Sequence, residues 1–182
     1  MLVVTEPEKM PVGEARAGDP AAWDVLFRRY QLPIYVYVFE LVHDEQTSLD
    51  IVQETFVAAT KYIGSLRDED KFGSWLFGIA HQKCIQRWRK RHREELLREE
   101  LVSELEEFEN DPAELLIRRE QEAEFMNLLN QLSPSHRSVL LLHFIEGFSL
   151  EEIAQITDVS LGTVKSRLHY AKKSLKQLLE AQ

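Results

Sequence analysis

The sequence predicts an all-α protein with two small helical domains joined by an acidic linker. Residues that favour helices, above all Leu, Glu, Arg, Ala and Gln, are common, and only seven glycines and six prolines interrupt the 182 residues. Apolar residues recur at helical spacing on both sides of residues 94–111, a segment with nine acidic residues and one basic residue. We therefore expect a flexible tail over residues 1–15, domains over 16–93 and 112–182, and a linker over 94–111.

The first two helices of the N-terminal domain are predicted on either side of Pro33. Asp19 and Pro20 form a helix-start signal, because an Asp side chain caps free backbone N–H groups and proline fits the first turn. Pro33 is expected to restart the chain before "IYVYVFELV" (34–42), which we interpret as a buried helix because no partner strand is near. The first helix carries an apolar stripe formed by Trp23, Leu26, Phe27 and Tyr30.

Two more helices, separated by a polar loop, complete this domain. The loop "GSLRDEDKFG" (64–73) follows a helix over residues 48–63. A further helix begins near residue 74 and becomes basic, since residues 83–93 hold six bases and no acid. The predicted buried face of the 48–63 helix consists of Leu49, Val52, Phe56 and Ala59.

The C-terminal domain contains a predicted helix–turn–helix. Asp111-Pro112 repeats the helix-start signal, and "LSPSHRSVLLLHFIEG" (132–147) is a helix between Pro134 and Gly147. Ser149 and Glu152 have capping-box spacing, residues 158–160 form the turn, and Ser160 caps the next helix. The buried stripe of that last helix is Val164, Leu168, Ala171, Leu175 and Leu178.

The outward face of the last helix suits DNA, with hydroxyls, long cations and flat rings that can read base edges in a major groove. It consists of Thr163, Lys165, Ser166, His169, Tyr170 and Lys173. An amphipathic bundle helix with a solvated lysine face is the alternative. The net charge of −9 is not evenly spread, because residues 83–93 and 163–179 are basic. Such patches are typical of phosphate binding. The protein as a whole is acidic, however, and we expect it to bind DNA weakly by itself.

Other functional classes find little support in the sequence. Glu40 and His43 have di-iron spacing but occur once, and His81 and Cys84 share a helix face without further ligands. No glycine-rich phosphate loop or nucleophile motif occurs, so we expect no enzyme, no metal, no cofactor and no small-molecule substrate. The sequence has neither a signal-peptide pattern nor a long apolar run, and we expect a cytoplasmic protein.

The motifs resemble those of a known family. "DIVQETF" (50–56), "WLFGIA" (75–80) and the basic helix end resemble region 2 of bacterial sigma factors, and residues 132–179 resemble sigma region 4. The chain resembles the extracytoplasmic-function (ECF, group IV) subfamily of the sigma-70 family over about residues 16–93 and 112–180. The resemblance implies a sigma factor that binds core RNA polymerase and directs promoter-specific initiation by recognising the −35 duplex and the melted −10 element.

The resemblance also implies partners and contact residues. The partners are promoter DNA and core polymerase, through the largest-subunit coiled coil and the flap region; an anti-sigma factor is left open. Polymerase contacts are expected at Asp50, Gln53, Glu54 and Thr55. Contacts to the −10 element are expected from a base-capturing set, Ser65, Arg67 and Asp68, and a phosphate-binding set, Lys83, Arg87 and Arg91. Contacts to the −35 element are expected at Thr163, Lys165, Ser166, Arg167, His169, Tyr170, Lys172 and Lys173.

Some positions depart from the family pattern or remain open. Gly78 and Gln82 stand where Arg and Asn are frequent, and we favour a core role for Trp75 over base stacking. The acids between Glu99 and Glu109 lead to the hypothesis that the linker mimics nucleic acid in a positively charged RNA path. The alternative function is a stand-alone helix–turn–helix regulator with an N-terminal helical sensor domain.

Overall fold

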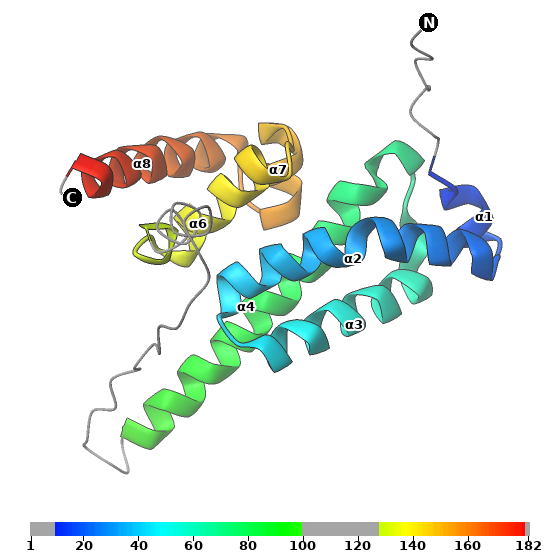
Figure 1. The fold of residues 1–182 in the computed structure, drawn as a ribbon, viewed down its shortest axis with the longest axis horizontal. Helices are drawn as coiled ribbons and strands as arrows, with labels where there is room; N and C mark the ends of the chain where they lie inside the picture. The colour runs from blue at the N-terminus through cyan, green and yellow to red at the C-terminus, as the bar shows by residue number, and fades with distance from the viewer. Residues whose placement is uncertain (1–9, 100–127, 181–182) are drawn as a thin grey trace, which may run out of the picture.

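The computed structural model describes residues 10–99 and 128–180, with side chains described through residue 90 in the first range. Every regular element in these two ranges is helical, which confirms the all-α prediction (Figure 1). Most of the predicted acidic linker, its proposed nucleic-acid mimicry and the helix start at Asp111-Pro112 lie outside the described residues.

The predicted N-terminal tail ends earlier than residue 15. A short helix, α1 (Val12–Arg16), buries Val12 and Ala15 against the bundle. The indole Nε1 of Trp23 donates to the Ala15 carbonyl at 3.0 Å, and Arg16 donates to the Leu66 carbonyl at 2.9 Å. These long-range contacts hold a segment that has no helical pattern of its own, so the predicted tail is wrong from Val12 onward.

Helix α2 (Pro20–Val42) begins at the predicted cap, because the Asp19 side chain accepts from the Ala21 N–H. It then continues through Pro33 without a break, where we expected the chain to restart. Proline removes one intrahelical hydrogen bond, but the helix buries residues on both sides of it. Leu26 and Ile34 are both fully buried, and this shared packing keeps the two halves in one helix.

Helix α3 (Glu45–Tyr62) and helix α4 (Phe72–Glu99) pack against α2, as Figure 1 shows. Two short 3-10 turns connect them, η1 (Ile63–Ser65) and η2 (Glu69–Lys71). The predicted buried face of α3 is confirmed except at Leu49, which is 48% exposed. Helix α4 also runs six residues beyond the predicted boundary at residue 93.

The C-terminal part contains α6 (Pro134–Leu140), the π-helical turn η3 (Leu141–Ile145), α7 (Leu150–Thr157) and α8 (Leu161–Glu180). The predicted start is confirmed, since Ser133 caps α6 and Pro134 is its first residue. Gly147, with a φ of 74°, follows η3 as the predicted stop. Val164, Leu168 and Ala171 of α8 are buried as predicted, while Leu175 and Leu178 pack partly buried on the core.

The two parts of the chain are in direct contact. Helix α7 packs along α4, α6 contacts α2, and one continuous hydrophobic core includes Leu76 and Phe77 from α4 with Ile153 and Ile156 from α7. Two predicted domains are thus joined by a shared core, which the sequence did not indicate. In the ranges that the structure describes, no helix is both long and apolar enough to cross a membrane.

Candidate nucleic-acid interface

The face of α3 predicted to bind polymerase is partly exposed. Gln53 and Glu54 are exposed and Asp50 is half-buried, with the Gln46 amide donating to its carboxylate at 3.3 Å. Thr55 is fully buried, and its hydroxyl donates to the Ile51 carbonyl at 2.7 Å. The prediction that Thr55 contacts polymerase is therefore wrong, because its side chain points into the core.

Glu54 connects this face to the basic part of α4. Its carboxylate accepts from Lys83 Nζ at 3.1 Å and from Arg87 Nη2 at 2.7 Å. Burial alone would raise the pKa of Glu54, but the hydrogen bonds and positive charges of Lys83 and Arg87 lower it overall. The two predicted phosphate-binding cations are thus held together by one acid from the neighbouring helix. The side chain of Arg91 lies outside the described residues.

The predicted −10 loop borders a hollow of about 800 Å³. Ser65 donates its hydroxyl to the Tyr62 carbonyl at 2.8 Å, and Asp68 accepts from the Asp70 N–H at 3.0 Å, so both residues stabilise the loop itself. The rings of Trp75 and Phe72 pack together with their centroids 5.8 Å apart, and Trp75 also lines the hollow. The structure brings together here Ser65, Arg67, Asp68, Trp75, Gly78, Gln82 and Lys83.

The hollow has a second wall, which comes from the helix–turn–helix. Gln155, Ile156 and Asp158 of α7 and the following turn line it opposite the loop. Sequence reasoning placed these two groups of residues in separate domains. Only the packing of α7 on α4 brings them to one site.

The helix–turn–helix itself follows the predicted pattern closely. Ser149 and Glu152 form a complete capping box, in which each side chain accepts from the other residue's backbone N–H. Asp158 adopts the left-handed conformation at a φ of 53°, which turns the chain sharply after α7. Ser160 then caps α8 by accepting from the Thr163 N–H at 3.1 Å.

The outward face of α8 is exposed at most of the predicted −35 positions. Arg167 and Thr163 are half-buried, and the Thr163 hydroxyl pairs with that of Ser160 at 2.9 Å. Ser166 donates to the carbonyls of its own helix, which leaves its oxygen free to accept. The exposed predicted positions are Lys165, Ser166, His169, Tyr170, Lys172 and Lys173.

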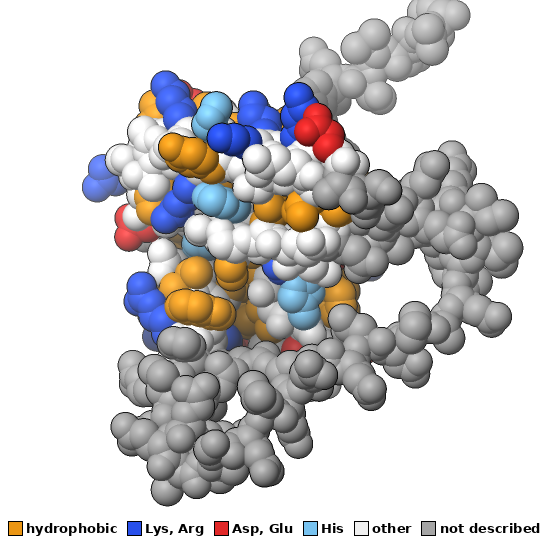
Figure 2. All heavy atoms as spheres, turned by 90° about the vertical axis from the view of Figure 1, so that its left-hand side faces the viewer, with side chains coloured by type: hydrophobic (Ala, Val, Ile, Leu, Met, Phe, Trp, Pro, Cys, Tyr) orange, Lys and Arg blue, Asp and Glu red, His pale blue; other side chains and the backbone are white. Residues whose placement is uncertain are grey.

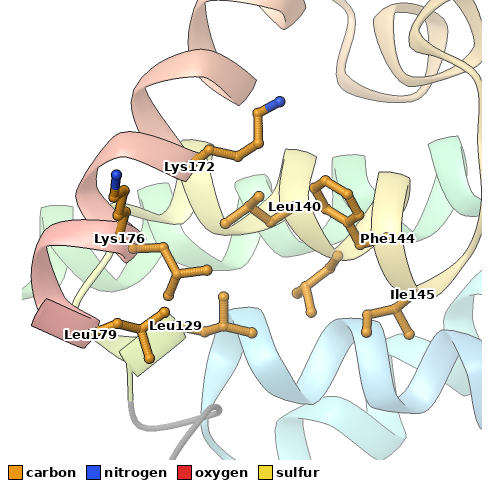
Figure 3. A pocket seen from close by; sticks show the side chains of 9 residues that line it. Leu129, Leu140, Phe144, Ile145, Lys172, Lys176 and Leu179 are labelled. Carbon is orange, nitrogen blue, oxygen red and sulfur yellow. The ribbon is translucent and has the colours of Figure 1, made fainter.

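An apolar groove beside α8 was missed by sequence reasoning. It measures about 400 Å³ and is lined mainly by Leu and Ile side chains from α6, η3 and α8, together with Leu129, which lies between Leu179 and Ile145 in Figure 3. Phe144 is 59% exposed and Ile145 is 53% exposed there. Lys172 borders this groove with Lys176, and Figure 2 shows Lys and Arg side chains around exposed hydrophobic ones on this end of the molecule. The apolar pair in "HFIEG" was the available sequence signal.

A buried arginine joins the two parts of the chain. Arg137 is 5% exposed and donates to the Glu40 carbonyl at 2.7 Å and to Nε2 of His43, both at the end of α2. It also donates to the carbonyls of Leu129, Asn130 and Leu132. Burial lowers the pKa of Arg137 and of His43 and raises that of Glu40. No sequence pattern singles out an arginine that will be buried.

His81 and Cys84, the pair considered as metal ligands, are both buried in the helical bundle. His81 Nδ1 and the Tyr37 hydroxyl share a hydrogen bond of 2.8 Å. Burial lowers the pKa of His81 to about 4 and raises that of the Cys84 thiol to about 12. Within residues 10–90 and 128–180, no three His, Cys, Asp or Glu side chains converge as metal ligands.

Known proteins match both parts of the chain. Residues 26–94 match the family model "Sigma-70 region 2", and residues 122–175 match "Sigma-70, region 4". The RNA polymerase sigma factor YlaC of Bacillus subtilis is 32% identical over 84% of this chain and 88% of its own. The ECF RNA polymerase sigma factor SigE of Mycolicibacterium smegmatis is 31% identical over 96% of this chain and 70% of its own.

A solved structure gives the same answer. The sigma factor RpoE of Bartonella quintana, in complex with the anti-sigma factor NepR, aligns with a TM-score of 0.69 at 28% identity and covers 85% of this chain and 94% of that one. Because the N-terminal half matches sigma region 2, a regulator with a sensor domain in that place is not supported. Both halves and their order agree, and the chain belongs to the extracytoplasmic-function group of the sigma-70 family of RNA polymerase sigma factors.

Proposed function

We propose that this sigma factor binds core RNA polymerase through α3 and selects promoters with two separate DNA-binding surfaces. The exposed face of α8, mounted on a fully capped helix–turn–helix, is the observation that carries the proposal. The chain positions polymerase and DNA and performs no catalysis of its own. It acts in the cytoplasm, where its promoter DNA lies.

The −35 duplex lies across α8. Lys165, His169 and Tyr170 are exposed on one face and can reach base edges in a major groove. Arg167 and Lys172 lie toward the two flanks of this face and contact phosphates. Lysine and arginine contacts of this kind orient the helix without reading sequence.

The melted −10 strand enters the hollow beside the η1–η2 loop. Arg67 and Asp68 are exposed there and supply a donor and an acceptor for an unpaired base. Lys83 and Arg87 hold the neighbouring backbone, and Glu54 fixes their positions through its two ion pairs. A phosphate that approaches must compete with Glu54 for these cations.

Polymerase contacts the sigma factor at two places. Asp50, Gln53 and Glu54 on α3 contact the largest-subunit coiled coil. The apolar groove beside α8 receives the flap region, since exposed Phe144 and Ile145 otherwise remain in water. The likeness to RpoE, which was solved with NepR, supports the proposal that an anti-sigma factor also binds this chain.

Reconstitution tests these assignments. The purified chain is mixed with bacterial core polymerase, analysed by size-exclusion chromatography and assayed on randomised promoters. Co-elution together with sequence-selective initiation supports the proposal. A chain that stays apart from polymerase yet binds duplex DNA by itself would overturn it.

Paired variants separate the two roles. Asp50→Ala with Gln53→Ala should weaken polymerase binding about tenfold, because both side chains face the partner. Lys165→Ala with His169→Ala should leave assembly intact and relax −35 selectivity by about tenfold, as expected for lost base contacts. If both pairs affect assembly alone, α8 does not read DNA. Thr60→Ala, on exposed α3 surface, is the matched control.

A further inference from the structure

We infer that Arg16 of helix α1 is a positioning residue for the −10 loop, because it holds both neighbours of the dipeptide Arg67-Asp68. The inference rests on the proposed function, which gives this dipeptide the capture of an unpaired base. It adds a residue from outside the loop and gives α1 a part in promoter selection.

One guanidinium group makes the two contacts. Arg16 Nη2 donates to the Leu66 carbonyl at 2.9 Å, and Arg16 Nη1 forms an ion pair with Glu69 Oε1 at 3.2 Å. Leu66 directly precedes Arg67, and Glu69 directly follows Asp68. The rigid planar fork of the guanidinium therefore fixes the chain on each side of the dipeptide. We call the contacts of Arg16 with Leu66 and Glu69 the loop clamp.

The exposure of the loop residues agrees with this clamp. Leu66 is 7% exposed and Glu69 is half-buried, whereas Arg67 and Asp68 between them are exposed. Both exposed residues line the −10 hollow. The loop is thus held at positions 66 and 69 and presents positions 67 and 68 to the hollow.

Hydrogen bonds within the loop stay inside its two 3-10 turns. The Leu66 N–H donates to the Ile63 carbonyl at 3.1 Å and closes η1. The Lys71 N–H donates to the Asp68 carbonyl at 3.1 Å and closes η2. Neither bond crosses from one turn to the other. Arg16 does so, because one of its acceptors lies at the end of η1 and the other at the start of η2.

Helix α1 is a firm support for Arg16. Ala15 is 2% exposed, and the indole Nε1 of Trp23 donates to its carbonyl at 3.0 Å. A Cβ atom built on Gly13 would lie 3.2 Å from Glu69 Oε1, so the backbone of α1 approaches the loop closely. Arg16 therefore extends from a backbone that is packed on the bundle, and the loop takes its position from α1.

A displaced loop should lose base selectivity in particular. Base edges are read by donors and acceptors at fixed positions, so a shift of Arg67 or Asp68 lowers the discrimination between bases. The phosphate contacts proposed for Lys83 and Arg87 come from α4 instead, where an acid of α3 holds both cations. Loss of the Arg16 contacts should thus change the choice of base at −10 and leave the −35 preference as it is.

Hydrogen exchange in the free chain tests the clamp directly. The amide protons of Leu66, Asp70 and Lys71 are hydrogen-bonded within the loop. In Arg16→Gln they should exchange about tenfold faster, as expected for the loss of a charge-assisted hydrogen bond. Arg28→Gln is the matched control, since Arg28 pairs with an acid of its own helix, and it should exchange as the wild type does.

Two results of this measurement would contradict the inference. Unchanged exchange of the loop amides in Arg16→Gln would show that the loop keeps its conformation without the clamp. Faster exchange throughout α2, α3 and α4 as well would show a general loss of stability in place of a local effect on the loop.

Promoter discrimination by the holoenzyme extends the test to function. Initiation is measured on a promoter selected from the randomised library and on versions with one −10 base or one −35 base replaced. Arg16→Gln should lower discrimination at one −10 base about tenfold, the size of one lost base contact, and leave −35 discrimination unchanged. Equal loss of activity on all these promoters would mean a merely structural role and would overturn the inference.

Direct-contact variants separate this inference from the proposed function. If Arg16 acts through the dipeptide, Arg16→Gln combined with Asp68→Ala should discriminate no worse than Asp68→Ala alone. Additive losses would make Arg16 an independent contact, against the inference. If neither Arg67→Ala nor Asp68→Ala changes −10 discrimination, the proposed function of the loop is refuted, while the exchange measurement still decides whether Arg16 holds the loop.

Discussion

Arg137 donates hydrogen bonds to five acceptors from two distant parts of the chain. Four of these are backbone carbonyls, and each would lose the guanidinium as a donor if Arg137 were replaced. A buried acceptor without a partner costs about 1–3 kcal/mol, and the cost grows with the number of partners lost. Arg137 therefore stabilises the fold and is not part of a binding surface.

The variant Arg137→Met tests this role. It keeps the apolar stem but removes all five hydrogen bonds, so the free energy of unfolding should fall by about 3 kcal/mol. Urea denaturation followed by circular dichroism measures it. Arg28→Met is the matched control, since Arg28 pairs with Asp24 of its own helix and its side chain is 75% exposed. Equal losses in the two variants would contradict the assignment.

His81 should make the stability depend on pH. Its pKa is lowered to about 4, while an unfolded histidine titrates near 6.5, so the unfolded state gains a proton first as the pH falls. The contribution of neutral His81 is present above pH 6.5 and lost progressively toward pH 4, by at most about 3 kcal/mol.

Urea denaturation between pH 7 and pH 4.5 measures this effect. His81→Gln should flatten the curve, because glutamine carries no titrating proton in this range. His169→Gln, at an exposed histidine of α8, should keep the slope of the wild type. A slope that survives in His81→Gln would assign the pH dependence to another group.

At the scale of the element, helix starts follow local rules. Asp19, Asp44, Ser133, Ser149 and Ser160 all cap helices with their side chains, and none of these interactions needs a distant residue. Whether a helix continues past a given residue does not follow local rules in the same way. Helix α2 passes through Pro33 and α1 forms against α2, because burial over many residues outweighs a single local preference.

The capping box of α7 offers a direct measurement. Ser149→Ala removes the acceptor for the Glu152 N–H and should lower the free energy of unfolding by about 1 kcal/mol. Gln155→Ala, an exposed position in the same helix, should change it by less than about 0.5 kcal/mol. Thermal unfolding of both variants and of the wild type measures this difference. An unchanged free energy of unfolding in Ser149→Ala would mean that the cap contributes nothing to stability.

At the scale of the whole molecule, charge and packing both favour weak solitary DNA binding. The net charge of −9 repels DNA at long range, and residues of α7 line one wall of the −10 hollow. Affinity is then left to polymerase, while this chain supplies the sequence preference. Repulsion weakens with salt, whereas the packing of α7 on α4 does not depend on it in the same way.

Neutralising the acidic segment tests the charge contribution. Replacing its acids with Gln should tighten binding of the free chain to duplex DNA at low salt and change the yield of abortive transcripts on polymerase. The replaced residues are Glu94, Glu95, Glu99, Glu100, Glu104, Glu106, Glu107, Glu109 and Asp111. Filter binding and transcript gels measure the two effects. Unchanged transcripts would argue against mimicry of nucleic acid by this segment.

Features that depend on neighbouring residues were predictable: the helix caps, the turn at Asp158, the buried stripe of α8 and the motifs of regions 2 and 4. Long-range packing, by contrast, turns Thr55 inward, buries Arg137 and brings α7 against α4 at Gly78. Periodicity identifies an apolar face, but it does not say which other face covers it. That choice depends on the shape and volume of surfaces far apart in the chain, and these exist only once the helices have packed.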